Sequence, residues 1–406
     1  IADSATLGGD CTGVLVIPAF DEPAALVEEL ARLPEDLLTI LVINNPPNKG
    51  ACNERLFDAL EFESSERFCM RHVPAPVLVV NRSTSPLPPR QGVGLARKIG
   101  ADIALRLMAN RQLPQTWIHS TDADAKLPAG YAHFAPPLDD PVAALVYPFV
   151  HDAPGRLGDA VQRYEIALHH YVLGLAHAGS PYAHHTIGST LAVHPVHYAV
   201  ARGFPRRAAG EDFYLINKLA KLGEVRQLAS PQITVSGRAS TRVPVGTGPN
   251  VARIDALQDP AQEYRYYSPL VFRALADVLR RLASLADPSH PAPPPERSRL
   301  PAATREAVDA WWQTVDAAAV LERSNARTVT QRQRLLTEWF DGFRTMRFIH
   351  TMRDAGLASV PLADLARAWG IDSSSDPQPL LRRLRRACFE EWSVGQLSGR
   401  EVYGNG

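Results

Sequence analysis

Two pairs of carboxylates stand where they could do chemistry. Asp122 and Asp124 are separated by one residue and follow a short apolar segment at 117–119. Carboxylate oxygens are the ligands that Mg²⁺ and Mn²⁺ prefer. Glu211 and Asp212 directly precede a helical pattern, and a positioned carboxylate can take a proton from a reacting group. The first pair is therefore a candidate site for a divalent cation, and the second pair is a candidate for a general base.

Each pair also has a structural interpretation. Aspartates that follow a strand often only cap a turn or the next helix. Acidic residues in the first turn of a helix stabilise its macrodipole by about 0.3–1 kcal/mol. Neither pair decides between chemistry and structure by itself. We favour chemistry because the two pairs occur in one chain beside the further motifs described below.

Alternating strands and helices must position these carboxylates. The predicted strands are 14–17, 39–43, 77–80, 117–119, 143–147, 190–193 and 232–235, and the longer predicted helices are 92–108, 159–178 and 212–222. Such alternation predicts a mostly parallel sheet covered on both faces. Ligands bind at the carboxyl ends of the strands in sheets of this kind. Those ends carry residues 20–22, 44–45 and 122–124.

The sequence changes character after residue 250. Strand patterns fade, a strongly helical segment covers 270–285, and 288–295 is a proline-rich stretch that predicts a stiff extended connector. Residues 302–392 have helical patterns throughout. We therefore predict two domains, an α/β domain over residues 1–250 and an all-helical C-terminal region over residues 251–406.

Four stretches, in this order, carry a resemblance to known enzymes. They are Val-Ile-Pro-Ala-Phe-Asp-Glu at 16–22, Gly-Val-Gly-Leu-Ala-Arg-Lys at 92–98, Thr-Asp-Ala-Asp-Ala at 121–125 and Gly-Glu-Asp-Phe-Tyr-Leu at 210–215. Together they resemble the family-two glycosyltransferases and relatives with the same A-type fold, over about residues 12–225. The resemblance implies a Rossmann-like, mostly parallel catalytic domain that binds a nucleotide-diphosphate sugar and Mn²⁺ or Mg²⁺. A hexosyl group would then pass to a hydroxyl acceptor.

The same resemblance implies roles for the carboxylates. Asp124 matches the direct metal ligand, and Asp122 matches the residue that leans towards the donor ribose or a metal-bound water. Asp212 matches the catalytic base of inverting members, with Glu211 beside it. The segment of Ala19, Phe20 and Glu22 falls where the nucleotide base lies, although a helix cap at Asp21 is an equal alternative.

This chain departs from the family in two ways. Where relatives usually have an Asp-rich turn after the second strand, it has Asn44-Asn45, so Asn44 takes the donor-side position without a carboxylate. It also lacks the Gln-x-x-Arg-Trp motif of the processive members, which argues against a polysaccharide synthase.

Three arginines are candidates for contact with the donor. Arg97 follows Gly92 in the predicted helix and could contact the donor phosphate or base, while a solvated basic face is the alternative. Arg238 and Arg242 lie in a polar, glycine-rich loop after the last predicted strand, at 236–248. A guanidinium can bind a diphosphate through two parallel hydrogen bonds. An ordinary surface loop is the competing interpretation.

Composition narrows the function classes. Lys plus Arg and Asp plus Glu both number 43, so the net charge is zero and no basic excess favours nucleic acid. The four cysteines are scattered, which predicts neither a zinc knuckle nor a disulfide framework and fits a reducing, cytoplasmic location. No apolar run approaches the ~20 residues of a membrane span, and the start has no signal-peptide pattern.

The histidines at 169–197 are dense but lack a zinc-protease spacing. We expect structural roles for most of them, with His184 or His185 as candidates for acceptor contact. Three rival functions stay open: a dinucleotide-binding oxidoreductase, a nucleotidyltransferase of related fold and a catalytically idle transferase-like interaction domain. The sequence names neither the sugar nor the acceptor, leaves inversion against retention open, and allows a homodimer through the helical region.

Overall fold

The computed structural model describes residues 11–45, 52–88, 90–138, 141–152, 155–239, 246–289, 300–372 and 376–391. They form a mixed α/β protein with an eight-stranded sheet and a largely helical remainder, which confirms the predicted fold class. Two compact units are formed, one by the described residues within 1–158 and 186–252, the other by those within 159–185 and 253–406. Helix α4 (Gly158–His177) thus lies almost wholly in the second unit. The boundary at residue 250 stays a prediction.

The large sheet has the strand order β3-β4-β2-β1-β5-β8-β6-β9. Its strands are β1 (Gly13–Ala19), β2 (Leu37–Ile43), β3 (Phe68–Val73), β4 (Ala75–Asn81), β5 (Ile118–Ser120), β6 (Val142–Val146), β8 (Leu191–Val193) and β9 (Glu224–Gln227). The pairings β1–β2, β2–β4, β1–β5 and β6–β9 are parallel, whereas β3–β4, β5–β8 and β6–β8 are antiparallel. The two central strands β1 and β2 are almost entirely buried, as their unbroken apolar sequences require.

The strand order changes direction at β1. After β1 the chain builds outward through β2 and β4, and it then returns to add β5 on the other side of β1. The crevice at the carboxyl ends of two such strands is the usual ligand site of an open α/β sheet. The residues after β1 and β5 lie at this position in the sheet, and they include the predicted metal motif of Asp122 and Asp124.

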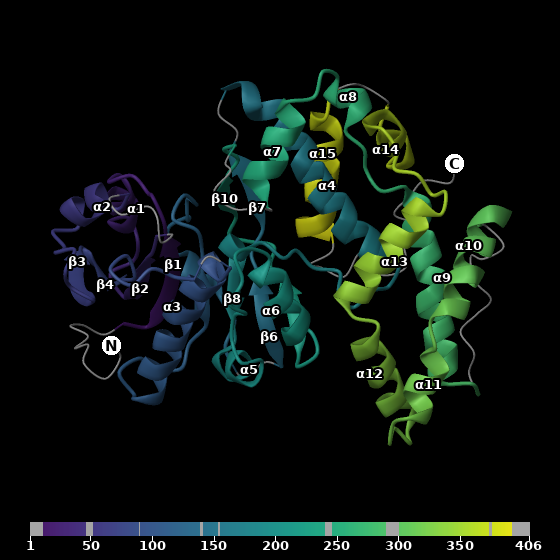
Figure 1. Ribbon diagram of the computed structural model, residues 1–406, viewed down its shortest axis with the longest axis horizontal. Helices are drawn as coiled ribbons and strands as arrows, with labels where there is room; N and C mark the ends of the chain where they lie inside the picture. The colour runs from purple at the N-terminus through teal and green to yellow at the C-terminus, as the bar shows by residue number, and fades with distance from the viewer. Residues whose placement is uncertain are drawn as a thin grey trace. The chain divides into compact units, whose positions relative to one another are not determined.

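Helices pack against this sheet. The first unit contains α1 (Leu26–Leu30), α2 (Glu54–Ala59), α3 (Gly92–Ala109), α5 (Pro195–Val200) and α6 (Glu211–Leu219). Helix α3 lies along β1 and β2, and α6 contacts β6 and β9 (Figure 1). A Cβ on Gly100 would come within 2.4 Å of Val16, so a glycine is needed for α3 to approach the sheet this closely. This close packing fixes the position of the α3 side chains relative to the strand ends.

Three strands were not predicted from the sequence, namely β3, β9 and β7 (Phe149–Asp152). Strands β3 and β9 are the two edges of the large sheet, where one side of the backbone is unpaired and an apolar run is unnecessary. The predicted strand at 232–235 exists as β10 (Ile233–Ser236), but it pairs with β7 in a separate two-stranded sheet.

The second unit is helical, as predicted for the C-terminal region. After α7 (Thr247–Asp255), which crosses the boundary, come α8 (Pro260–Glu263), α9 (Pro269–Ala286), α10 (Ala302–Thr314), α11 (Ala317–Glu322), α12 (Val329–Trp339), α13 (Gly342–Asp354), α14 (Leu362–Ala368), α15 (Gln378–Arg386) and a π-helical turn at Ala387–Glu391. Helix α9 contacts α10, α12 and α13 and so lies at the centre of their packing (Figure 1). In the part of the chain that the structure describes, no helix is both long and apolar enough to cross a bilayer.

Candidate active site

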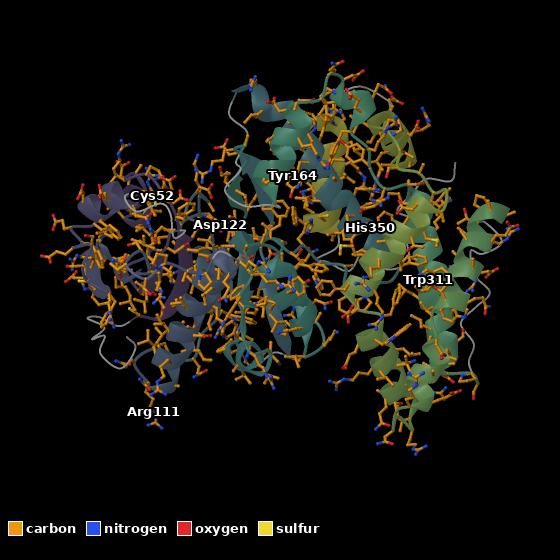
Figure 2. The ribbon with its side chains drawn as sticks, in the orientation of Figure 1. Cys52, Arg111, Asp122, Tyr164, Trp311 and His350 are labelled. Carbon is orange, nitrogen blue, oxygen red and sulfur yellow. The ribbon has the colours of Figure 1, made fainter. Side chains whose placement is uncertain are left out.

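The predicted carboxylates come together in the first unit. Strands β1 and β5 run parallel, with Val16 opposite Ser120, so the residues that follow both strands emerge at one edge of the sheet. Asp122, labelled in Figure 2, lies two residues beyond β5. We call Glu22, Asp122, Asp124, Glu211 and Asp212 the strand-end carboxylate cluster.

Arg97 joins two parts of this cluster that are far apart in the sequence. Its Nε donates to Glu211 Oε1 at 2.9 Å, and its Nη2 donates to Asp122 Oδ1. Its Nη1 donates to the hydroxyl of Ser120 at 2.7 Å and to the carbonyl of Thr121 at 3.2 Å. One guanidinium on α3 therefore ties the end of β5 to the start of α6.

The Arg97 side chain is only 3 % exposed, and that of Glu211 is 5 % exposed. Burial alone would lower the pKa of Arg97, because it penalises the charged guanidinium. The carboxylates of Asp122, Glu211 and Asp212 outweigh this penalty and leave the pKa raised. The arginine is consequently a fixed positive charge inside the cluster.

Gly188 makes room for this guanidinium. A Cβ at that position would lie 2.6 Å from Nη2 of Arg97 and 3.0 Å from its Cζ. The backbone N–H of Gly188 also donates to Asp212 Oδ2 at 2.9 Å. The loop before β8 thus contacts both the arginine and the predicted base, and a side chain there would displace one of them.

Asp212 occupies the first turn of α6, which begins after Gly210 in the left-handed conformation (φ 71°). Its Oδ1 accepts the N–H of Phe213 at 2.7 Å, in addition to the bond from Gly188. Desolvation, followed by repulsion from Glu211, raises the pKa of Asp212 to about 7, against the opposing effects of these hydrogen bonds and Arg97. A carboxylate tuned to this range is a competent proton acceptor near neutral pH.

Asp124 lies beside the loop that follows β10. Arg238 Nη2 is 2.9 Å from Asp124 Oδ2 and 3.5 Å from Glu22 Oε1. Two carboxylates from the ends of different strands therefore already hold a positive group between them. Oxygen donors of this kind fit Mn²⁺ or Mg²⁺.

Coordination by protein alone is incomplete at this edge. Across the described ranges, three metal-binding side chains gather only at a different place, in the second unit. Mg²⁺ is usually held by one or two carboxylates together with substrate phosphates and water. A cation at Asp122 and Asp124 would need such additional ligands.

Asparagines brace the edge next to this site. The Asn44 side chain donates to the carbonyl of Ala19 at 3.0 Å, and Asn53 donates to the carbonyl of Asn44 at 3.0 Å. The Asn53 side-chain oxygen also accepts the N–H of Asp21, whose φ of 54° turns the chain sharply after β1. Asp21 does not cap α1, whose N-cap is Ala25. The amide of Asn44 thus holds the ends of β1 and β2 together.

The glycines of the second motif serve packing. A Cβ on Gly94 would lie 2.5 Å from the carbonyl of Pro205, and the Gly94 N–H donates to the carbonyl of Arg207 at 2.9 Å. Strand β4 ends at Asn81, well before α3 begins at Gly92. A dinucleotide-binding site would instead need these glycines free to approach a pyrophosphate directly after a strand. This arrangement disfavours the oxidoreductase interpretation.

Three residues with predicted contacts lie outside the described residues or in the second unit. Arg242 lies outside the described residues, together with the rest of 240–245 in its loop. His184 and His185 are buried in the second unit.

Sequence reasoning missed four residues that build the site, namely Asn53, Ser120, Thr121 and Gly188. Their roles come from hydrogen bonds and close contacts to residues distant in the chain. Only Ser120 and Thr121 had a local signal, because they directly precede Asp122.

Comparisons with known proteins add little to the geometry. No protein-family model matches the sequence, and no curated protein matches it either. Among solved structures, the chain is similar to a mannosyltransferase from Pyrobaculum calidifontis, described in complex with GDP-mannose and Mn²⁺. The identity is 16 %, the match covers 80 % of this chain and 85 % of that chain, and the TM-score is 0.33. At this TM-score the function has to rest on the site itself.

Proposed function

We propose that the protein is a metal-dependent glycosyltransferase that moves a sugar from a nucleoside-diphosphate donor to a hydroxyl acceptor. One observation carries the proposal: Arg97 links the Asp122 carboxylate after β5 to Glu211 at the start of α6. Asp122 of the predicted metal motif and Glu211, which directly precedes the predicted base Asp212, therefore share one guanidinium at the edge of the sheet where ligands bind.

Asp122 and Asp124 are the residues that would hold Mn²⁺ or Mg²⁺, whose charge offsets that of the departing diphosphate. Asp124 is the stronger candidate for direct ligation, because its partner Arg238 is 40 % exposed and can move away, whereas Asp122 is paired with Arg97, which is only 3 % exposed. A cation at Asp124 competes with Arg238 for the same oxygen. Once released, Arg238 can contact the diphosphate, and we expect the same of Arg242.

Asp212 is the proposed base for an inverting reaction. It takes the proton of the acceptor hydroxyl while that oxygen forms a bond to the anomeric carbon and the nucleoside diphosphate leaves. Each Asp212 oxygen accepts one backbone N–H, and a carboxylate oxygen has capacity for a second bond. The two backbone hydrogen bonds therefore orient the carboxylate and leave each oxygen able to accept a further hydrogen bond.

Glu211 and Arg97 act through other residues in this proposal. Glu211 is buried against Arg97 and helps to raise the pKa of Asp212 by repulsion. The proposed wall of the donor pocket is formed at the ends of β1 and β2, by Ala19, the last residue of β1, and by Phe20, Glu22 and Asn44, which follow the two strands. Asn44 contributes to it by holding the backbone of Ala19.

Ligand-induced stabilisation tests the proposal. We expect UDP or GDP to raise the melting temperature in the presence of Mn²⁺ and not in its absence. A ligand at 100 times its dissociation constant contributes about 2.7 kcal/mol. The Asp124→Ala variant should lose this gain, whereas Asp58→Ala, an exposed aspartate on α2, should keep it.

Two results would overturn the proposal. One is the absence of stabilisation by any nucleoside diphosphate with Mn²⁺ or Mg²⁺. The other is stabilisation by NAD or NADP that is independent of metal, since that would favour the oxidoreductase. A nucleotide-sugar panel assayed for metal-dependent hydrolysis then identifies the donor.

A further inference from the structure

Three metal-binding side chains meet inside the second unit. His169 lies on α4, His185 follows that helix, and Cys388 lies in the π-helical turn after α15. One ligand atom from each lies within 4.8 Å of the other two. All three are buried, at 0 %, 2 % and 0 % exposure. We call these residues the His–His–Cys cluster.

We propose that this cluster binds Zn²⁺. Imidazole nitrogen and thiolate sulfur are the ligands that zinc prefers, at about 2.0–2.1 Å and 2.3 Å. In a tetrahedral site two such nitrogens lie about 3.3 Å apart. Nδ1 of His169 and Nε2 of His185 are 3.0 Å apart, so these two nitrogens would need to separate by only a few tenths of an ångström, while the Cys388 sulfur lies within 4.8 Å of both.

A buried carboxylate prepares His169 for this role. Its Nε2 lies 3.2 Å from Glu165 Oε1, which also accepts a 2.6 Å hydrogen bond from Arg385 Nε. A proton on Nε2, shared with the carboxylate, leaves the lone pair of Nδ1 directed at the cluster. Metal-binding histidines almost always have such a partner on the second nitrogen, where it fixes the tautomer.

The same contacts connect two distant segments of the chain. Arg385 of α15 is bonded to Glu165 of α4, and the two helices lie side by side (Figure 1). The ring of Phe389 packs against both imidazoles, with centroid distances of 5.2 and 5.7 Å, and shields them from water. A zinc ion here would link the π-helical turn after α15 to α4. Its binding energy would therefore add to the stability of the fold.

This site is independent of the strand-end carboxylate cluster. Its donors are nitrogen and sulfur in a dry interior, whereas the other cluster offers partly exposed oxygens. The proposal therefore does not depend on the proposed transferase activity, and the two metals can be separated experimentally.

Cobalt spectroscopy of the full-length chain tests the proposal. We expect dialysed wild-type protein to retain about one zinc per chain by elemental analysis, because the three ligands meet at a single place. After replacement by Co²⁺ it should show a thiolate-to-cobalt charge-transfer band. Cys388→Ser should lose the band and most of the zinc. The matched control Cys11→Ser, a buried cysteine of the first unit, should keep both.

Two further variants make the result decisive if Cys388→Ser folds poorly. Glu165→Gln keeps the three ligands and should weaken zinc binding by about 10–100-fold, the usual effect of losing a carboxylate partner. Asp124→Ala should leave the band unchanged. A wild-type protein without tightly bound zinc and without the cobalt band would overturn the proposal and leave a hydrogen-bonded histidine pair.

Discussion

The two clusters of metal-binding side chains differ in donors and exposure. In the first unit, oxygen donors lie at strand ends, and the Asp122 side chain is 40 % exposed. In the second, nitrogen and sulfur donors are sealed between α4 and the C-terminal turn. In the first cluster, Arg97 and Arg238 offset part of the negative charge.

Our two proposals assign a reacting role to the first cluster and a structural role to the second. A cation that must arrive and leave with a substrate needs exposed, hard ligands that phosphate can share. A cation that stabilises a fold needs soft, preorganised ligands out of solvent. We therefore expect changes in the first cluster to affect turnover and changes in the second to affect stability.

The largest effect is expected from Asp212→Asn. Loss of a general base usually costs about 10²–10⁴-fold in rate. We predict a fall of this size in kcat, with donor binding retained and with the cobalt band of the second unit intact. Steady-state kinetics and donor titration measure the first two quantities. An equal loss of donor binding would mean that Asp212 contacts the donor or is structural.

Replacing Arg97 by Met should have the next largest effect, on stability. The change leaves Glu211 as a buried carboxylate without its cation, and breaking a buried pair in this way costs about 3–5 kcal/mol. Denaturant unfolding measures the loss. Arg226→Met, which removes an exposed pair with Glu224, should change stability by about 1 kcal/mol or less. Similar losses in both variants would contradict the central role of Arg97.

Gly188→Ala probes the crowding around the guanidinium. The added methyl group would lie 2.6 Å from Arg97 Nη2, and overpacking of this kind costs about 1–3 kcal/mol. Gly158→Ala is the control, because nothing lies within 4 Å of its Cβ position. Thermal unfolding of both variants is the measurement. A Gly188→Ala protein as stable as the control would show that Arg97 can move freely.

The smallest effect is expected from a change of pH by one unit, measured on kcat/KM. The base must be ionised, so kcat/KM of the free enzyme should fall about tenfold for each pH unit below the pKa of Asp212, which burial raises to about 7. The raised pKa also means that the folded state binds this proton more tightly than the unfolded one. The stability contribution of Asp212 is therefore lost as pH rises from about 4 through about 7. An acid limb that stays near pH 4 would exclude Asp212 as the base.

The predicted strands were correct where both faces of the strand are buried. The runs at 14–17 and 39–43 are apolar throughout because β1 and β2 are covered on both faces, so their sequences carry the signal. β9 has the sequence Glu-Val-Arg-Gln and lies at an edge, where polar side chains reach solvent. Such a segment becomes a strand only because β6 provides a partner.

The prediction of the site likewise succeeded for residues with a local sequence pattern and failed for contacts between distant residues. Asp122 and Asp124 could be located at a strand end because the preceding residues have a local pattern. Their connection to Glu211 could not, because it runs through the side chain of Arg97 and depends on how closely α3 packs on β1. The sequence suggested donor contact for Arg97, whereas the structure surrounds its guanidinium with protein acceptors.

The sequence by itself determined that this chain forms an α/β sheet, places carboxylates after β1 and β5, and continues into helices, because those features depend on local periodicity. Only the tertiary structure decided which side chains meet. His169, His185 and Cys388 have no motif spacing, and Cys388 lies about 200 residues beyond His185. They share a cluster because the π-helical turn after α15 packs on α4. Packing between segments so far apart in the chain cannot be predicted from the spacing of neighbouring residues.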